Sequence, residues 1–121
     1  MRRLAISILI TSMPVIAQEV QTQFPEGSAL LTTETLTAAL SGKVYTAQPA
    51  KGPSWRIQYN DNGFVYVNVG SFSDTGKWFA KDSTVCSEGR QIKFFCNEVR
   101  TKDNTLYLKR ESGEVLKLEL R

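Results

Sequence analysis

Residues 54–69 read SWRIQYNDNGFVYVNV, and this stretch decides the fold. Apolar and polar side chains alternate in its first half, which is the period of a β-strand with one buried face. The apolar members are Trp55, Ile57 and Tyr59. Asn62-Gly63 follows, and Asn-Gly between two strand-like runs is the strongest short signal for a β-hairpin. Residues 64–69 are β-branched or aromatic at five of six positions, so we predict that the second strand is covered on both faces.

The same pattern continues on both sides of this hairpin. Further strands are predicted at 44–46, 77–80, 84–86, 91–100, 105–110 and 115–120. Turns are predicted between them at 73–76, 81–83, 87–90, 101–104 and 111–114. About eight strands, with a turn signal roughly every 8 to 12 residues, indicate a mainly β protein built as an antiparallel meander. Because a sheet of this size twists and its open edges pair with other chains, we predict closure into a small barrel, with a two-sheet sandwich as the alternative.

One short segment before the strands has helical spacing instead. Leu31 and Leu36 flank Thr32 as a hydrophobic staple flanks an N-cap residue. Leu36 and Leu40 share one face at this spacing, and Gly42 is placed to end the helix. We predict a helix that plugs one end of the barrel through its leucines.

The N-terminus predicts export. Arg2 and Arg3 precede an apolar run, and a small-residue cleavage site ends at Ala17. This order is typical of a secretory signal peptide over residues 1–17, cleaved between Ala17 and Gln18. The run is too short to span a bilayer, which takes about 20 apolar residues, and no later stretch is long enough. We therefore expect a periplasmic or secreted chain without stable membrane insertion.

Composition divides the rest of the chain into two parts. Residues 18–30 are polar, show no period and contain Pro25 and Gly27, so they are predicted to be a flexible lead. Residues 31–121 are predicted to form a single β-barrel-like domain. The net charge of +3 is mostly a property of the two N-terminal arginines. Charge therefore gives no reason to expect nucleic acid as a partner.

Cys86 and Cys96 are the only cysteines. They flank the turn predicted at 87–90, and residues opposite each other in an antiparallel pair lie within disulfide range. Export would place them in an oxidising compartment. Their spacing is not Cys-x-x-Cys, and Ile92 and Phe94 share a face with Cys96. We predict a buried, inert structural disulfide that contributes about 2–3 kcal/mol, rather than a redox-active pair.

The chain contains no histidine, which excludes Ser-His and Cys-His catalysis and histidine-ligated metal sites. Its aspartates Asp61, Asp74, Asp82 and Asp103 all fall in predicted turns, where a short polar side chain bonds the backbone. Lysines alternate with apolar residues or lie in loops, which does not favour the buried, deprotonated lysine of Ser-Lys chemistry. We therefore predict no catalytic residues, no metal and no cofactor.

Aromatic residues are concentrated in the middle of the chain. One interpretation is a barrel mouth lined for an apolar ligand. The other, which we favour from the sequence, is a barrel filled by its own side chains. A partner protein could instead contact the loop at 47–53, which two prolines stiffen. The candidate binding residues are Lys51, Trp55, Tyr59, Tyr66 and Trp78.

Several short motifs carry a resemblance to a known group of proteins. They are Leu36-Thr37-Ala38-Ala39-Leu40-Ser41-Gly42, Asp61-Asn62-Gly63, Gly76-Lys77-Trp78, Cys86, and Cys96-Asn97-Glu98-Val99. Over residues 31–110 the chain resembles small exported bacterial proteins of unknown function, whose domain is a helix followed by a compact β-barrel with one disulfide. This resemblance implies envelope localisation and a β-barrel, and it implies no reaction. A looser similarity to lipocalins and avidins rests on the meander and on Gly-x-Trp.

These observations favour a non-catalytic periplasmic or secreted binding module. It would bind a small apolar ligand or an envelope partner protein. The alternatives are an envelope hydrolase that uses carboxylates, such as Asp82, and a structural component of the envelope.

Overall fold

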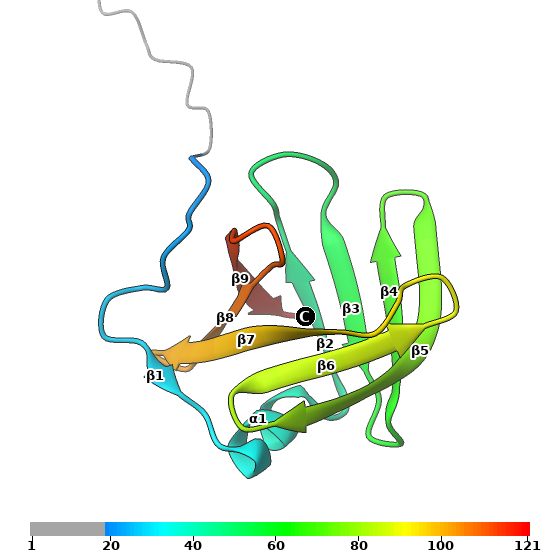
Figure 1. Cartoon of the computed structure of the whole chain (residues 1–121), viewed down its shortest axis with the longest axis horizontal. Coiled ribbons are helices and arrows are strands. Elements are labelled where there is room, and N and C mark those ends of the chain that lie inside the picture. Colours follow the sequence, from blue (N-terminus) through cyan, green and yellow to red (C-terminus); the bar gives the residue numbers. More distant parts are fainter. Residues whose placement is uncertain (1–18) are drawn as a thin grey trace, which may run out of the picture.

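The computed structural model describes residues 19–121, so the predicted signal peptide and its cleavage site lie outside the described residues. The elements are β1 (Ala29–Leu30), α1 (Thr33–Leu40), β2 (Lys43–Ala47), β3 (Trp55–Tyr59), β4 (Phe64–Val69), β5 (Phe72–Lys81), β6 (Thr84–Gly89), β7 (Phe95–Lys102), β8 (Thr105–Lys109) and β9 (Val115–Leu120). Figure 1 shows the strands curling around a common interior, with α1 below them. In residues 19–121 no helix has the length and apolar character needed to cross a bilayer.

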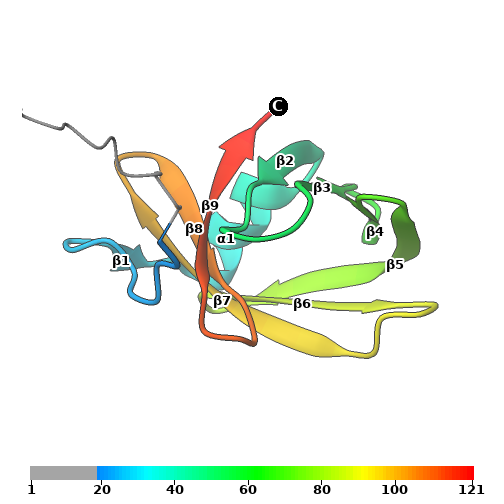
Figure 2. The same ribbon diagram turned by 90° about the horizontal axis from the view of Figure 1, so that it is seen from above.

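Strands β2 to β9 form a closed antiparallel barrel. Each strand pairs with the next along the chain, and β2 closes the ring by pairing with β9. This closure confirms the predicted eight-stranded meander and decides against the sandwich. The view in Figure 2, turned by 90°, shows the strands passing around the interior in this order. Strand β1 lies outside the ring, where Ala29 pairs with Thr101 of β7.

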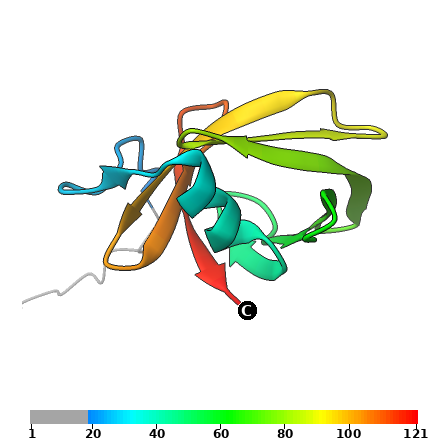
Figure 3. The ribbon, with the colours of Figure 1, turned by 90° about the horizontal axis from the view of Figure 1, so that it is seen from below.

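Helix α1 closes one end of the barrel, as the leucine spacing predicts. The hydroxyl of Thr32 accepts a hydrogen bond from the backbone N–H of Thr35 at 3.1 Å, and the Thr35 hydroxyl accepts one from the N–H of Thr32 at 2.9 Å. This reciprocal pair satisfies two backbone donors that a helix start leaves open. Leu36 and Leu40 are fully buried in the barrel core. Figure 3 shows α1 lying across this end of the strands.

Backbone contacts fix the helix to neighbouring turns. The backbone N–H of Leu31 donates to the hydroxyl of Ser83 at 2.9 Å, so the β5–β6 turn lies beside the helix start. The N–H of Gly42 donates to the carbonyl of Tyr59 at 2.7 Å. Gly42 has φ +77°, a left-handed conformation that glycine adopts without steric cost. The helix therefore occupies the end of the barrel that carries the β3–β4 and β5–β6 turns.

Two of the predicted turns are wrong, because strand residues occupy their positions. Residues 73–76 lie within β5, where Gly76 pairs with Val65 on one side and Gly89 on the other. A Cβ at Gly76 would stand 2.0 Å from the carbonyl oxygen of Glu88, so glycine allows β6 to approach closely here. Likewise β6 continues to Gly89, the connection is at 90–94, and β7 begins four residues later than predicted.

The expectation that residues 64–69 are covered on both faces is also wrong. Val65 is buried and points inward, whereas Phe64 and Tyr66 are each 39% exposed on the outer surface. Aromatic residues favour strands on exposed faces as well as on buried ones, so an unbroken run of strand-forming residues does not show that both faces are buried. Strand β4 has one covered face.

The segment before the helix, predicted as a flexible lead, contacts the barrel along its length. The carbonyl of Gln21 accepts a hydrogen bond from the backbone N–H of Val115 at 2.6 Å. The Phe24 ring lies 4.8 Å from the guanidinium of Arg100 and 5.4 Å from the ammonium of Lys109, measured to the ring centroid. Such cation–π contacts hold the segment against β7 and β8.

Candidate binding site at the open end of the barrel

A cavity of about 140 Å³ lies inside the barrel. Its apolar lining includes Trp55, Ile57, Val67, Val69, Val85 and Leu108. Trp55 begins β3 and Val69 ends β4, so the cavity reaches the end of the barrel away from α1. The loops β2–β3 and β4–β5 stand at this end, at the top of Figure 1. The expectation that the barrel is filled by its own side chains is therefore wrong at the open end.

A second, more open cleft adjoins the cavity. The two share Trp55, Ile92, Phe95 and Asn97 as lining residues, and the cleft adds residues of the β8–β9 loop. A molecule seated in the cavity would thus have an adjoining surface on which to extend. We call the cavity and this cleft together the mouth site.

The carboxylate of Asp74 shapes one wall of the mouth site. It accepts backbone N–H hydrogen bonds from Ile92 at 2.9 Å, Gln91 at 3.1 Å, Thr75 at 2.9 Å and Arg90 at 3.2 Å. These donors, that of Ile92 foremost, outweigh burial and hold the pKa of Asp74 below its ordinary value. Because its oxygens are occupied by the 90–92 loop, Asp74 positions this wall and is not free to act on a substrate.

Gly89 makes room for that carboxylate. A Cβ at Gly89 would lie 2.1 Å from Oδ2 of Asp74, which no side chain tolerates. We predicted a turn role for both residues. Both lie in strands, where they hold the β6–β7 connection at the edge of the cavity.

Asn97 is the polar residue at the cavity wall with unused hydrogen-bonding capacity. It points inward from β7 opposite Val85 and is only 9% exposed. Its Nδ2 donates to the carbonyl of Lys109 at 3.0 Å, which fixes the orientation of the amide. Within residues 19–121 no donor reaches its Oδ1. Asn97 therefore offers the acceptor Oδ1 to the mouth site, and its Nδ2 keeps a second N–H besides the one given to Lys109.

A charged pair borders the mouth site on the β8–β9 side. The guanidinium of Arg110 lies 4.9 Å from the ring centroid of Trp55 and 2.7 Å from Oε1 of Glu114. The other carboxylate oxygen of Glu114 accepts the backbone N–H of Ala50 at 2.8 Å. Burial alone would raise the pKa of Glu114, but the donors Ala50 and Arg110 outweigh it and hold the pKa below its ordinary value. Through these bonds Glu114 ties the β2–β3 loop to the β8–β9 loop and neutralises the charge of Arg110.

The predicted binding residues are not all brought together. Trp55 and Tyr59 line the cavity, and Trp78 is buried deeper, where its Nε1 donates to the carbonyl of Asn60 at 2.9 Å. Tyr66 lies on the outer surface, and Lys51 is exposed in the β2–β3 loop. Asp74 and Asn97 were missed as site residues, because their inward orientation depends on strand registers that the turn prediction misplaced.

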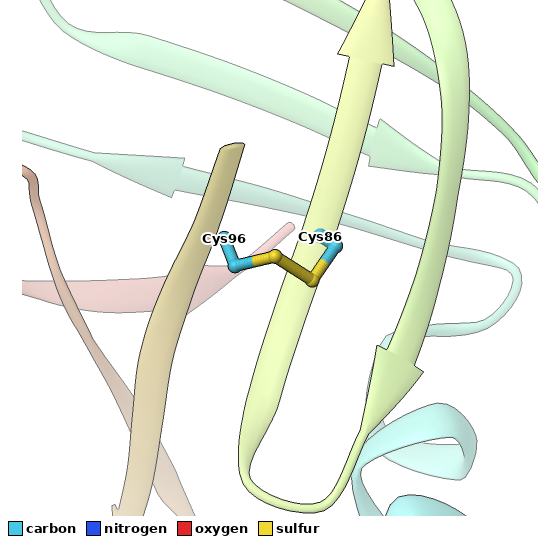
Figure 4. The surroundings of a disulfide bond; sticks show 2 residues. All are labelled: Cys86 and Cys96. Atoms are coloured by element: carbon cyan, nitrogen blue, oxygen red, sulfur yellow. A yellow bond between two sulfur atoms is a disulfide. The ribbon is translucent and has the colours of Figure 1, made fainter. Parts of the chain in front are cut away.

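Cys86 and Cys96 form the predicted disulfide, directly opposite each other in β6 and β7 with Cα atoms 4.0 Å apart (Figure 4). The bond lies on the outer face of the barrel, where Cys86 is buried and Cys96 is exposed. The prediction of a wholly buried bond is therefore wrong. Phe94, which is 55% exposed, stacks on Phe79 on this face. A disulfide indicates an oxidising compartment.

A cluster of metal-ligating side chains would be a further kind of candidate site. Among residues 19–121, no three Cys, Asp or Glu side chains gather as a metal site. Comparisons with protein-family models, curated proteins and solved structures found no match. The site is therefore interpreted from its own geometry.

Proposed function

We propose that this protein is a non-catalytic binding module that holds a small apolar molecule in the mouth site. The observation that carries the proposal is the apolar cavity of about 140 Å³ inside the open end of the barrel. An apolar cavity of about 150 Å³ in another protein stays dry and binds benzene. Transfer of an apolar molecule from water to such a space is favourable in proportion to the area it buries.

The absence of catalysis is part of this proposal. The one buried carboxylate at the cavity wall, Asp74, is occupied by backbone donors. Burial raises the pKa of the Tyr59 hydroxyl, which keeps it neutral and unsuited to act as a base. A screen on esters and peptidoglycan fragments tests this point. Turnover that is lost in Asp82→Ala would overturn it in favour of the hydrolase alternative.

A cavity-filling variant tests the binding site. Val67 lines the cavity, whereas Val44 shares the outer face of the barrel with Gln58. Val67→Phe should weaken binding of benzene or toluene at least tenfold, because the ring occupies the space. Val44→Phe makes the same change on the outside and should leave binding unchanged. Titrations followed by methyl NMR measure both. Equal binding by the two variants would show that the cavity is not the site.

The native ligand can be sought directly. Protein purified from its own host should carry an extra mass in native mass spectrometry, and Val67→Phe should lose it. A wild-type protein that never carries such a mass, and that binds no apolar probe, would contradict the proposal.

A second candidate function is contact with an envelope partner through the β2–β3 loop. The observation in its favour is the bracing of this loop, in which Nε2 of Gln48 donates to the carbonyls of Pro49 at 3.0 Å and Gly52 at 3.2 Å. Lys51 is exposed at its tip. Lys51→Ala should abolish capture of the partner in the native host without affecting the cavity. Unchanged capture would exclude this loop.

Localisation in the periplasm or outside the cell belongs to the same proposal. The disulfide and the N-terminal sequence pattern support it. N-terminal sequencing of protein from the native host should begin at Gln18. A first residue upstream of this position in a cytoplasmic fraction would contradict the proposal.

A further inference from the structure

If the mouth site binds a small molecule, as proposed above, its polar groups restrict the chemistry of that ligand. One N–H of Nδ2 of Asn97 donates to the carbonyl of Lys109, and no donor among residues 19–121 reaches its Oδ1. In residues 19–121 no fully enclosed side-chain oxygen or nitrogen lacks a partner. The unpartnered Oδ1 is therefore not enclosed by protein and borders accessible space. Asn97 lines both the cavity and the adjoining cleft, so that space is the mouth site.

In the described part of the chain, no charged group that lines the cavity is available to a charged ligand, and the one unpaired carboxylate of the cleft, Glu111, is exposed outside the apolar space. The Asp74 oxygens receive four backbone N–H groups, and Arg110 is paired with Glu114 at 2.7 Å. A charge placed in an apolar cavity without a partner carries a large desolvation cost. The hydroxyls of Ser87 and Tyr59, both on residues that line the cavity, can each donate or accept and so do not select between ligands. The remaining group is the side-chain amide of Asn97, whose unpartnered Oδ1 can accept a hydrogen bond from a ligand.

We infer that the ligand is a neutral, flat, apolar molecule of about one or two fused rings that donates a single N–H or O–H hydrogen bond to Oδ1 of Asn97. The cavity volume sets the size, since it holds about one ring and the cleft allows a second to extend. The apolar lining excludes charge, and the free acceptor favours a donor. Phenols and indoles have this chemistry.

Matched probes and variants test the inference. Indole and indene share a bicyclic shape, but only indole has an N–H donor. The wild-type protein should bind indole about five- to tenfold more tightly than indene, the ratio expected for one net hydrogen bond. Asn97→Leu should bind the two equally, because the acceptor is gone. Asn68→Leu makes the same change on the outer face, where Asn68 bonds Ser73, and should keep the wild-type ratio.

The outcomes separate this inference from the proposed function. If wild-type protein binds indole and indene equally, or if Asn97→Leu keeps the preference, the donor assignment is overturned while a binding cavity stands. If neither probe binds, both fail. Should Asn97→Leu not fold, the Asn97 side-chain amide of the wild type is followed by NMR. Its resonances should shift with indole and not with indene, and equal shifts would overturn the inference.

Discussion

Replacing Leu36 with alanine tests whether α1 is part of the barrel core. Leu36 is fully buried against the strands. Leu→Ala substitutions at such positions lower the free energy of unfolding by about 2–5 kcal/mol, because apolar contacts are lost and a cavity remains. A domain of this size has about 5–15 kcal/mol in total. The single variant should therefore fold, and the double variant with Leu40→Ala should lose most of its stability.

Urea unfolding followed by tryptophan fluorescence measures this loss. The midpoint should fall while the m-value is unchanged, because the surface exposed on unfolding is nearly the same. Thr37→Ala, an exposed change in the same helix, should shift the free energy by less than about 0.5 kcal/mol. A loss below about 1 kcal/mol for Leu36→Ala would refute the packing of α1 as the plug of the barrel.

Other predictions follow from the strands around the mouth. Reduction of Cys86–Cys96 should lower the free energy of unfolding by about 3 kcal/mol, measured by urea titration with and without reductant, and Cys86→Ala/Cys96→Ala should show no effect of reductant. Because backbone donors lower the pKa of Asp74, its stabilising effect is complete above about pH 4 and is lost as the pH falls through the lowered pKa. The protection factors of the 90–92 amides, which are exchange rates corrected for the intrinsic effect of pH, should fall in that acid range, and in Asp74→Asn they should be lower than in the wild type at neutral pH. Gly76→Ala should lower the urea midpoint more than Gly113→Ala, because a Cβ at Gly76 would stand 2.0 Å from the carbonyl oxygen of Glu88, whereas alanine at Gly113 bears only the strain of φ +96°.

Local patterns predicted the fold well where one physical signal dominates. Alternation in β3, the Asn-Gly turn and the Thr32 cap each depend on neighbours along the chain, and each is confirmed. The closed barrel followed from the number of strands and from the cost of open edges. The disulfide pairing followed because the chain has two cysteines.

The site was harder to predict, because it depends on contacts that are distant in sequence. Asp74 has the sequence context of a turn residue, yet it uses its hydrogen-bonding capacity on backbone donors 16 to 18 residues away. Gly76 likewise has the context of a turn but permits the close approach of two strands. Aspartate and glycine have the same local signal in a turn as at these strand positions. Only the strand register distinguishes the two, and the register depends on residues distant in sequence.

The position of the cavity follows from the sizes of the inward-facing side chains. Near α1 the interior holds Tyr59 and Trp78, whose rings meet edge to face at 5.1 Å. Toward the mouth, Val69, Ser87 and Gly89 are small lining residues among larger ones such as Trp55 and Phe72. An eight-stranded barrel is just wide enough for its side chains to fill it, so small residues at these three positions leave space that the larger neighbours do not fill. The sequence predicts a turn at Ser87 and Gly89, and turn residues do not line a barrel interior. The small residues that leave the cavity open were therefore not recognised as interior residues.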